Sequence, residues 1–196
     1  IMFSLLSISF IVNRRTSTYN SLAAAGFISL CLNPYSLFDV GFQLSYLAVA
    51  SILYFTPYIQ SLITCKNKIQ QYIWGIVAVS IAVQIGTFPI SIFYFKSFPT
   101  YNILTNILVI PLAYILLSNT LIILATYYIP ILYKIFASTL DFAVSYMQKV
   151  IFTIVSFPNS SIYIEISKSQ TILLYVAIAG MILFLEMRKQ EMEYRV

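Results

Sequence analysis

Long stretches without a charged residue dominate the chain and predict its architecture. Such stretches run over residues 16–38, 40–65, 69–95, 97–133 and 169–185. A helix that crosses a bilayer needs roughly 20 mostly apolar residues, and backbone amides in lipid must bond within a helix or a closed barrel. Because the stretches lack the short alternating segments of barrel strands, they predict membrane helices.

Seven hydrophobic elements follow from this pattern, near residues 1–12, 18–33, 41–60, 70–95, 102–128, 135–157 and 170–187. The predicted fold class is all-α, a polytopic transmembrane helical bundle of about six to seven membrane elements. The first element is too short to span and lacks the basic start and cleavage site of a signal peptide. We interpret 1–12 as the remnant of a helix that began upstream, in an N-terminally truncated fragment whose residues 1–196 form a single transmembrane domain.

Composition narrows the class of protein further. The chain is 60% apolar and 9% charged, whereas soluble proteins are about 45–50% apolar and about 25% charged. The absence of histidine excludes histidine-dependent catalysis and histidine-rich zinc sites. No glycine-rich phosphate loop accompanies the serines and threonines, so we expect no enzyme and no cofactor. Two cysteines, Cys31 and Cys65, cannot form a disulfide scaffold.

The basic residues predict the orientation of the chain, because short cytoplasmic loops collect Lys and Arg. If the seven elements alternate, eight of the eleven bases fall on one side: Arg14, Arg15, Lys66, Lys68, Lys134, Arg188, Lys189 and Arg195. The tail 188–196 is therefore expected in the cytoplasm. Tyrosine pairs such as Tyr54 and Tyr58 stand near helix ends, where an anchoring belt at the membrane interface is a more economical interpretation than base stacking.

Polar residues and prolines interrupt two of the elements. In 70–95 they are Gln84, Gly86, Thr87 and Pro89, and in 102–128 they are Asn102, Asn106, Pro111 and Asn119. Proline removes a helical hydrogen bond, so both helices are expected to kink or break. The amides have two interpretations: they hydrogen-bond a neighbouring helix, or they line a wet path together with unwound backbone.

The element 134–157 is amphipathic. Its polar residues recur at helical spacings and form one stripe: Ser138, Asp141, Ser145, Gln148, Lys149 and Ser156. The helix either spans and presents the stripe to a pore or bundle interior, or it lies flat in the interface. A flat helix would place the basic tail outside the cytoplasm, against the preference of basic residues for the cytoplasmic side, so the charge distribution favours a spanning helix.

Asp39 immediately precedes the element 41–60 and has two interpretations. As a helix N-cap it would bond orphan amides and suit the helix dipole. It could also form part of a pore mouth, together with Gly41 and Gln43 just inside the helix.

Two motifs resemble those of ComEC-type competence proteins. Residues 33–49, NPYSLFDVGFQLSYLAV, resemble the family pattern NP-x-x-L-x-D-x-GFQLSF-x-AV, and Gln84, Gly86, Thr87 and Pro89, followed by Asn106 and Pro111, resemble its Q-x-GT-x-P and N-x-x-x-x-P segments. The resemblance covers residues 14–117. It implies a channel in the bacterial inner membrane that carries single-stranded DNA into the cytoplasm during natural transformation. Relatives often add a metallo-β-lactamase-like domain, whose histidine ligands this chain cannot supply.

The resemblance implies single-stranded DNA, the lipid bilayer and other DNA-uptake proteins, including a cytosolic motor, as partners; a homo-oligomer is compatible with it. Phosphates need a wet path lined with donors or cations, and the candidate lining is sparse: Lys149 with the amides Gln43, Gln84, Asn102, Asn106 and Asn119. Basic loops could attract the emerging strand, although a role as topology signals is the simpler explanation. A small-solute transporter and an inactive truncated fragment are the alternatives.

Overall fold

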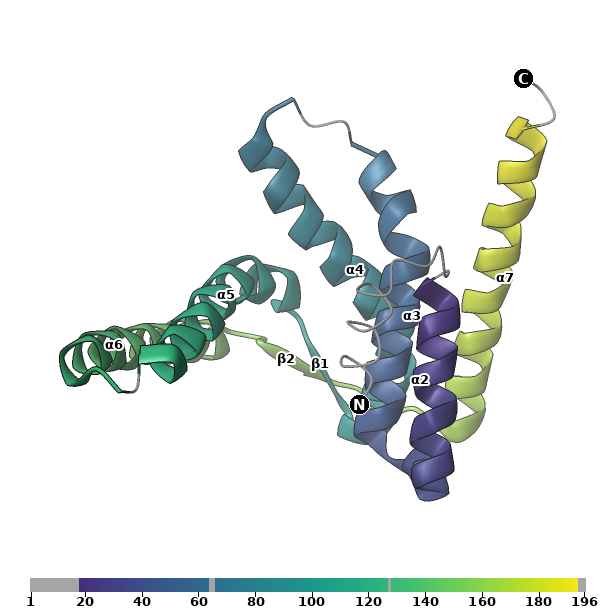
Figure 1. Cartoon of the computed structure of the whole chain (residues 1–196). Helices are drawn as coiled ribbons and strands as arrows, with labels where there is room; N and C mark the ends of the chain where they lie inside the picture. Colours follow the sequence, from purple (N-terminus) through teal and green to yellow (C-terminus); the bar gives the residue numbers. More distant parts are fainter. Residues whose placement is uncertain (1–17, 64–65, 127, 194–196) are drawn as a thin grey trace. The chain divides into compact units, whose positions relative to one another are not determined.

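The computed structural model describes residues 18–63, 66–126 and 128–193, with side chains described as far as 188 (Figure 1). The expected remnant helix at 1–12 lies outside the described residues, and so does the end of the tail. The chain divides into two compact units. The first comprises residues 1–64, 81–98 and 163–196, and the second comprises residues 65–80 and 99–162.

The first unit is built from apolar helices. These are α2 (Thr18–Leu32), the short 3₁₀ helix η1 (Pro34–Phe38), α3 (Val40–Ser61), the C-terminal part of α4 (Lys68–Phe95) and α7 (Lys168–Glu193). Helices α2, α3 and α7 lie alongside one another (Figure 1). The Tyr54 hydroxyl of α3 donates to the Ile182 carbonyl of α7 at 3.2 Å, and that of Tyr175 donates to the Gly86 carbonyl of α4 at 3.1 Å. These bonds connect α7 to both helices.

A helical hairpin forms most of the second unit. Helix α5 (Asn102–Thr126) is followed closely by α6 (Pro130–Val155), and the two pack along each other (Figure 1). At the far end the Tyr101 hydroxyl donates to the Pro158 carbonyl at 3.1 Å, and the Thr100 amide donates to the Ser160 carbonyl at 3.1 Å. Because the helices meet at both ends, α6 runs antiparallel to α5.

Two short strands stand beside this end of the hairpin. Strand β1 (Ser97–Pro99) pairs with β2 (Ser161–Tyr163) in a two-stranded sheet. Next to the sheet the Ile164 amide donates to the Lys96 carbonyl at 3.0 Å. Lys96 has a φ of 53°, in the left-handed region where the chain turns sharply after α4. The sheet thus joins the end of α4 to the segment before α7.

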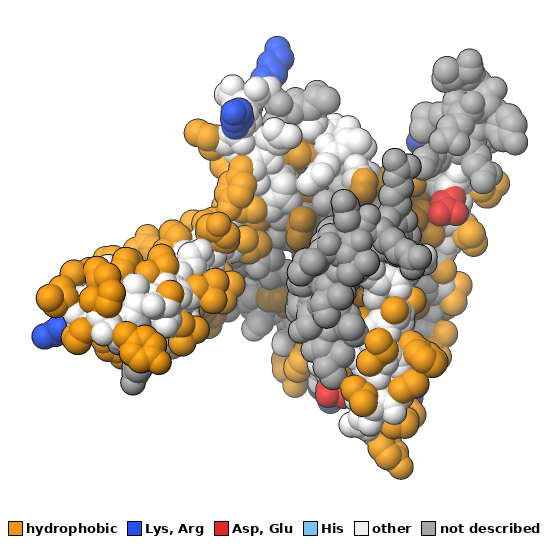
Figure 2. Space-filling model, in the orientation of Figure 1, with side chains coloured by type: hydrophobic (Ala, Val, Ile, Leu, Met, Phe, Trp, Pro, Cys, Tyr) orange, Lys and Arg blue, Asp and Glu red, His pale blue; other side chains and the backbone are white. Residues whose placement is uncertain are grey.

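Within the described residues, four helices are long and apolar enough to cross a bilayer: α3, α4, α5 and residues 168–188 of α7. Helix α2 is apolar but has only 15 residues, a rise of about 22 Å against a hydrocarbon core of about 30 Å. The visible surface is mostly hydrophobic, with charged side chains in isolated patches (Figure 2). The all-α membrane fold expected from the sequence is therefore confirmed.

Element boundaries agree closely with the hydropathy pattern, with two differences. Helix α6 begins at Pro130, five residues before the expected start at 135, because proline is favourable in the first turn of a helix, where its missing N–H would have no acceptor. Helix α7 continues to Glu193, beyond the expected end at 187. The residues after 187 are mostly good helix formers, so the helix continues after its hydrophobic stretch ends.

Neither α4 nor α5 breaks at its internal proline. Pro89 and Pro111 each lie inside a helix that continues on both sides, so the expected breaks do not occur. Two side chains donate to α4 carbonyls near Pro89: Thr87 donates its hydroxyl to the Val83 carbonyl at 2.8 Å, and Tyr175 of α7 donates to the Gly86 carbonyl. The carbonyl that loses its helical donor at Pro89 is that of Ile85, four residues earlier.

Candidate functional site

The first motif forms a hydrogen-bonded turn at the entry to α3. Asp39 is the N-cap, and its carboxylate accepts from the Gly41 amide at 2.8 Å. The side-chain amide of Gln43 donates to the Leu37 carbonyl at 2.8 Å. Asn33 caps η1, because its side-chain oxygen accepts from the backbone amide of Tyr35 at 3.1 Å. The N-cap interpretation of Asp39 is confirmed. In this arrangement the side chains of Asp39 and Gln43 hydrogen-bond to backbone groups and stabilise the turn.

The second motif contains a close approach between two helices of the first unit. Gly86 of α4 is buried against Ser51 of α3: a β-carbon at position 86 would lie 2.8 Å from the Ser51 β-carbon and 3.4 Å from the Leu47 carbonyl. Pro89 is almost fully buried one turn further on. Gly86, Thr87 and Pro89 therefore allow α3, α4 and α7 to pack closely, as small residues do in membrane helix interfaces.

Asn106 of α5 bonds a neighbouring helix within the second unit. Its amide donates to the Ser80 hydroxyl of α4 at 3.0 Å, and Ser80, which is 2% exposed, donates in turn to the Ile76 carbonyl at 2.8 Å. Gln84 follows Ser80 by one helical turn and is half-buried, and so is Asn102 at the start of α5. For Asn106 the structure favours the helix–helix interpretation over a pore lining.

Asn119 has a similar role inside the hairpin. Its amide donates to the Thr139 hydroxyl at 2.9 Å and to the Phe136 carbonyl at 3.3 Å, both on α6. The side chain is buried, and its carbonyl oxygen has no hydrogen-bond partner among the described residues. Asn119 thus connects the two helices but leaves one acceptor unsatisfied.

The polar stripe of α6 faces away from α5. Asp141, Gln148 and Lys149 are all exposed. The residues at the opposite helical positions are half-buried or buried, and Ile154 is only 7% exposed. Asp39 is exposed as well, but its carboxylate caps α3, whereas these three side chains lie along the length of α6.

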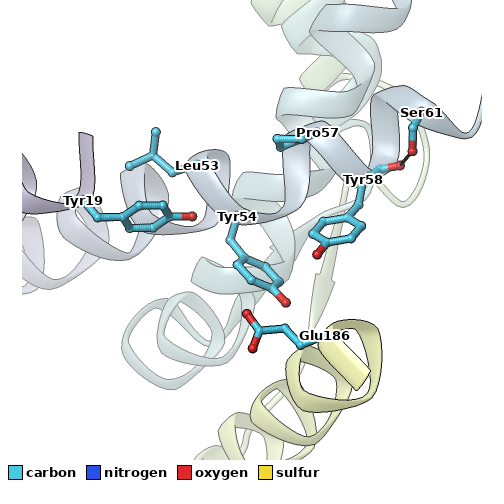
Figure 3. A pocket seen from close by; sticks show the side chains of 7 residues that line it. All are labelled: Tyr19, Leu53, Tyr54, Pro57, Tyr58, Ser61 and Glu186. Atoms are coloured by element: carbon cyan, nitrogen blue, oxygen red, sulfur yellow. Dashed lines mark hydrogen bonds between the residues drawn. The ribbon is translucent and has the colours of Figure 1, made fainter. Parts of the chain in front are cut away.

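A pocket of about 730 Å³ lies in the first unit and was not anticipated as a site. Its described lining residues come from three helices: Tyr19, Leu53, Tyr54, Pro57, Tyr58, Ser61 and Glu186. Figure 3 shows the hydroxyls of Tyr54 and Tyr58 on the side that faces Glu186. The sequence marked Tyr54 and Tyr58 as interfacial, but nothing in it connected them with Tyr19 and Glu186, which are far away along the chain.

One ion pair joins the segments beside the sheet. The Lys96 ammonium lies 2.7 Å from a Glu165 carboxylate oxygen, with both side chains more than half exposed. The hydrogen bond and charge of Glu165 raise the pKa of Lys96, and those of Lys96 lower the pKa of Glu165. Among the described residues no group of three or more Cys, Asp or Glu side chains is placed to hold a metal ion.

Comparison with known proteins identifies the family. A family model described as Competence protein matches residues 1–189. A segment of 101 residues is 27% identical to ComE operon protein 3 of Bacillus subtilis (strain 168), covering 52% of this chain and 12% of that relative. No solved structure matches the chain. The chain belongs to the Competence protein family, which confirms the resemblance of its motifs, although it spans only a small part of the length of that relative.

Proposed function

We propose that this member of the Competence protein family forms part of the passage that carries single-stranded DNA across the bacterial inner membrane during natural transformation. Family membership supports a role in competence and DNA uptake. The four apolar helices make the chain a membrane protein. The proposal adds the channel, the single-stranded cargo and a cytoplasmic C-terminus, together with a cytosolic motor and other DNA-uptake proteins as partners.

The observation that carries the channel proposal is the exposed stripe of α6. Helix α6 packs one side on α5 and leaves Asp141, Gln148 and Lys149 exposed on the other, beside the exposed apolar side chains of Phe142 and Phe152. Polar and charged side chains inside a bilayer are costly and face water or protein. The stripe would therefore line a hydrated path, with the remaining wall supplied by other segments of the assembly or by another copy of the chain.

Fewer residues are left to line the passage than the sequence suggested, because two of the candidate amides pack against neighbouring helices. Asn106 and Asn119 already bond neighbouring helices, and Gly86 is enclosed. Their roles are to hold the helices together, so the lining consists chiefly of the α6 stripe. Gln84 and Asn102 are half-buried and contribute at most at its edge. Such a lining has few cations and suits weak, sequence-independent passage.

Aqueous labelling of single cysteines tests this proposal. In a background without Cys31 and Cys65, we expect Gln148→Cys and Lys149→Cys in cells to react with a membrane-impermeant thiol reagent. Val176→Cys, on the exposed apolar side of α7, is the lipid-facing control and should not react. Incoming DNA should protect the α6 cysteines from labelling.

DNA uptake by cells gives the functional measurement. With the full-length gene, Lys149→Leu should reduce transformation, while Val176→Leu should not. Protein levels must match in both strains. Unreactive α6 cysteines together with normal transformation by Lys149→Leu would contradict the proposed lining.

A further inference from the structure

The pocket between α2, α3 and α7 is aromatic, anionic and rich in hydrogen-bond acceptors. Tyr19, Tyr54 and Tyr58 supply three phenol rings, and the Tyr54 and Tyr58 ring centroids are 5.5 Å apart. Glu186 supplies a carboxylate, and none of the lining residues that the structure describes is a lysine or arginine. Aromatic faces and a carboxylate both attract cations.

Two of the hydroxyl protons around the pocket are already engaged. Tyr54 donates to the Ile182 carbonyl at 3.2 Å, and Ser61 donates to the Tyr58 carbonyl at 2.7 Å. Their oxygens therefore retain only lone pairs for a ligand. Tyr54 and Ser61 therefore offer acceptors to a ligand, and not donors.

Pro57 adds a further acceptor. It lies inside α3 and has no N–H, so the Leu53 carbonyl one turn earlier loses its helical donor. Leu53 and Pro57 both line the pocket. A ligand with several N–H donors would satisfy this set of groups.

Glu186 is available to such a ligand. The neighbouring Arg188 guanidinium lies over the Phe184 ring, 5.9 Å from its centroid. Among the side chains that the structure describes, Glu186 forms no ion pair. Its charge is therefore not neutralised within this part of the chain.

The pocket also lies at the level where the hydrophobic spans end. Tyr19 is in the first turn of α2, Ser61 is the last residue of α3, and Glu186 is two residues before the end of the apolar part of α7. These helix ends meet at one side of the unit, and in helices that span a bilayer such ends lie near the lipid headgroups.

We propose that this pocket binds a primary alkylammonium group. The ammonium would lie against the tyrosine rings and donate hydrogen bonds to the Glu186 carboxylate and the neighbouring oxygens. Its position fits the ethanolamine headgroup of a membrane lipid, and a free aliphatic amine offers the same chemistry. A phosphate backbone does not fit, because the carboxylate would repel it. The inference is independent of the proposed passage of DNA.

Lipid selection by the purified full chain tests the proposal. The chain is equilibrated with equal amounts of phosphatidylethanolamine and phosphatidylcholine, whose headgroups differ in having a primary or a quaternary ammonium. Native mass spectrometry then counts the lipids retained. We expect a preference of about tenfold for phosphatidylethanolamine, since charge-assisted hydrogen bonds form only with the primary ammonium. Glu186→Gln should reduce this preference to near equality.

Matched variants control for folding and for surface charge. Glu165→Gln removes the same charge from the same unit outside the pocket, and it should keep the preference. Tyr58→Leu should lose it, while Tyr114→Leu, an exposed tyrosine of α5, should not. Far-ultraviolet circular dichroism verifies that each variant keeps its helix content.

A second experiment distinguishes the two sources of the ammonium group. The chain is reconstituted in phosphatidylcholine nanodiscs and titrated with butylammonium or tetramethylammonium, and its thermal unfolding is followed. Stabilisation by butylammonium alone, lost in Glu186→Gln, supports a site that also accepts free amines. Lipid selection without this response supports the headgroup as the ligand.

Three results would overturn the proposal. The first is equal retention of both lipids with no response to butylammonium. The second is an undiminished preference in Glu186→Gln. The third is binding of a short oligodeoxythymidylate that survives Glu186→Gln but is lost in Tyr58→Leu, because this result would identify the pocket as a base-stacking site.

Discussion

The contact between Gly86 and Ser51 leads to the sharpest stability prediction. Gly86→Ala adds a β-carbon that would lie 2.8 Å from the Ser51 β-carbon, and real β-carbons do not approach other atoms so closely. Ser51 is itself only 7% exposed. Rotation of its hydroxyl cannot relieve a contact with its β-carbon, so α3 and α4 must separate.

The magnitude follows from a comparison with a second glycine. A β-carbon at Gly180 on α7 would meet nothing within 4 Å, so Gly180→Ala should gain up to about 1 kcal/mol from helix propensity alone. Gly86→Ala gains the same propensity but overpacks the interface, which costs about 1–3 kcal/mol. The free energies of unfolding of the two variants should therefore differ by about 1–3 kcal/mol.

Reversible unfolding of the chain in mixed micelles, with an increasing fraction of sodium dodecyl sulfate, measures this difference. Circular dichroism follows the loss of structure. Adding Ser51→Gly to Gly86→Ala removes the atom that clashes, so the double variant should recover part of the loss, and a double-mutant cycle should give a favourable coupling energy. Equal stabilities of Gly86→Ala and Gly180→Ala would refute the close-packing argument.

Three further predictions concern capping, the hairpin and the ion pair. Asp39→Ala should destabilise the chain by about 0.5–2 kcal/mol, whereas Asp39→Asn, which still caps, should cost less in the same unfolding assay. Thr139→Val removes one acceptor of the Asn119 side-chain amide and should lower the free energy of unfolding by about 0.5–1.7 kcal/mol. Thr120→Val, on the exposed side of α5, is the control. Glu165→Gln should lower stability at neutral pH, by less in high salt. The pKa of Glu165 is lowered in the folded chain, so its contribution to stability should be present above pH 4.5 and disappear as the pH falls through the folded pKa. The pKa of Lys96 is raised in the folded chain, so its contribution to stability should be present below pH 10.5 and disappear as the pH rises through the folded pKa. A pH-independent effect of Glu165→Gln would contradict this assignment.

Hydropathy was sufficient to predict the α-helices from α2 to α7 because each apolar stretch is bounded by charges or turn residues. Asp39 was also predictable as an N-cap, since that function depends only on neighbouring amides. The prolines were misleading. Pro89 was expected to kink or break α4, but the helix continues through it. Around it α4 contacts Ser51 of α3 and Tyr175 of α7, and a one-dimensional pattern does not contain such contacts.

The candidate site was less predictable for the same reason. Gly86 and Asn106 stand out in the sequence as polar or small residues at membrane depth, yet whether they line a path or pack depends on their neighbours Ser51 and Ser80. The pocket at Glu186 combines residues from three helices, and α2 is separated from α7 by most of the chain. The sequence could predict the chemistry of each residue but not which residues meet.

The closure of the α5–α6 hairpin at both ends has a consequence for membrane insertion if α6 spans the bilayer. Helix α5 emerges from the ribosome first and, without a single charge, partitions into lipid readily. Helix α6 carries Asp141 and Lys149 and would insert poorly alone. If α6 spans the bilayer, the bond between Asn119 and Thr139 would let the two helices enter as a pair, with the more apolar α5 favouring insertion of α6.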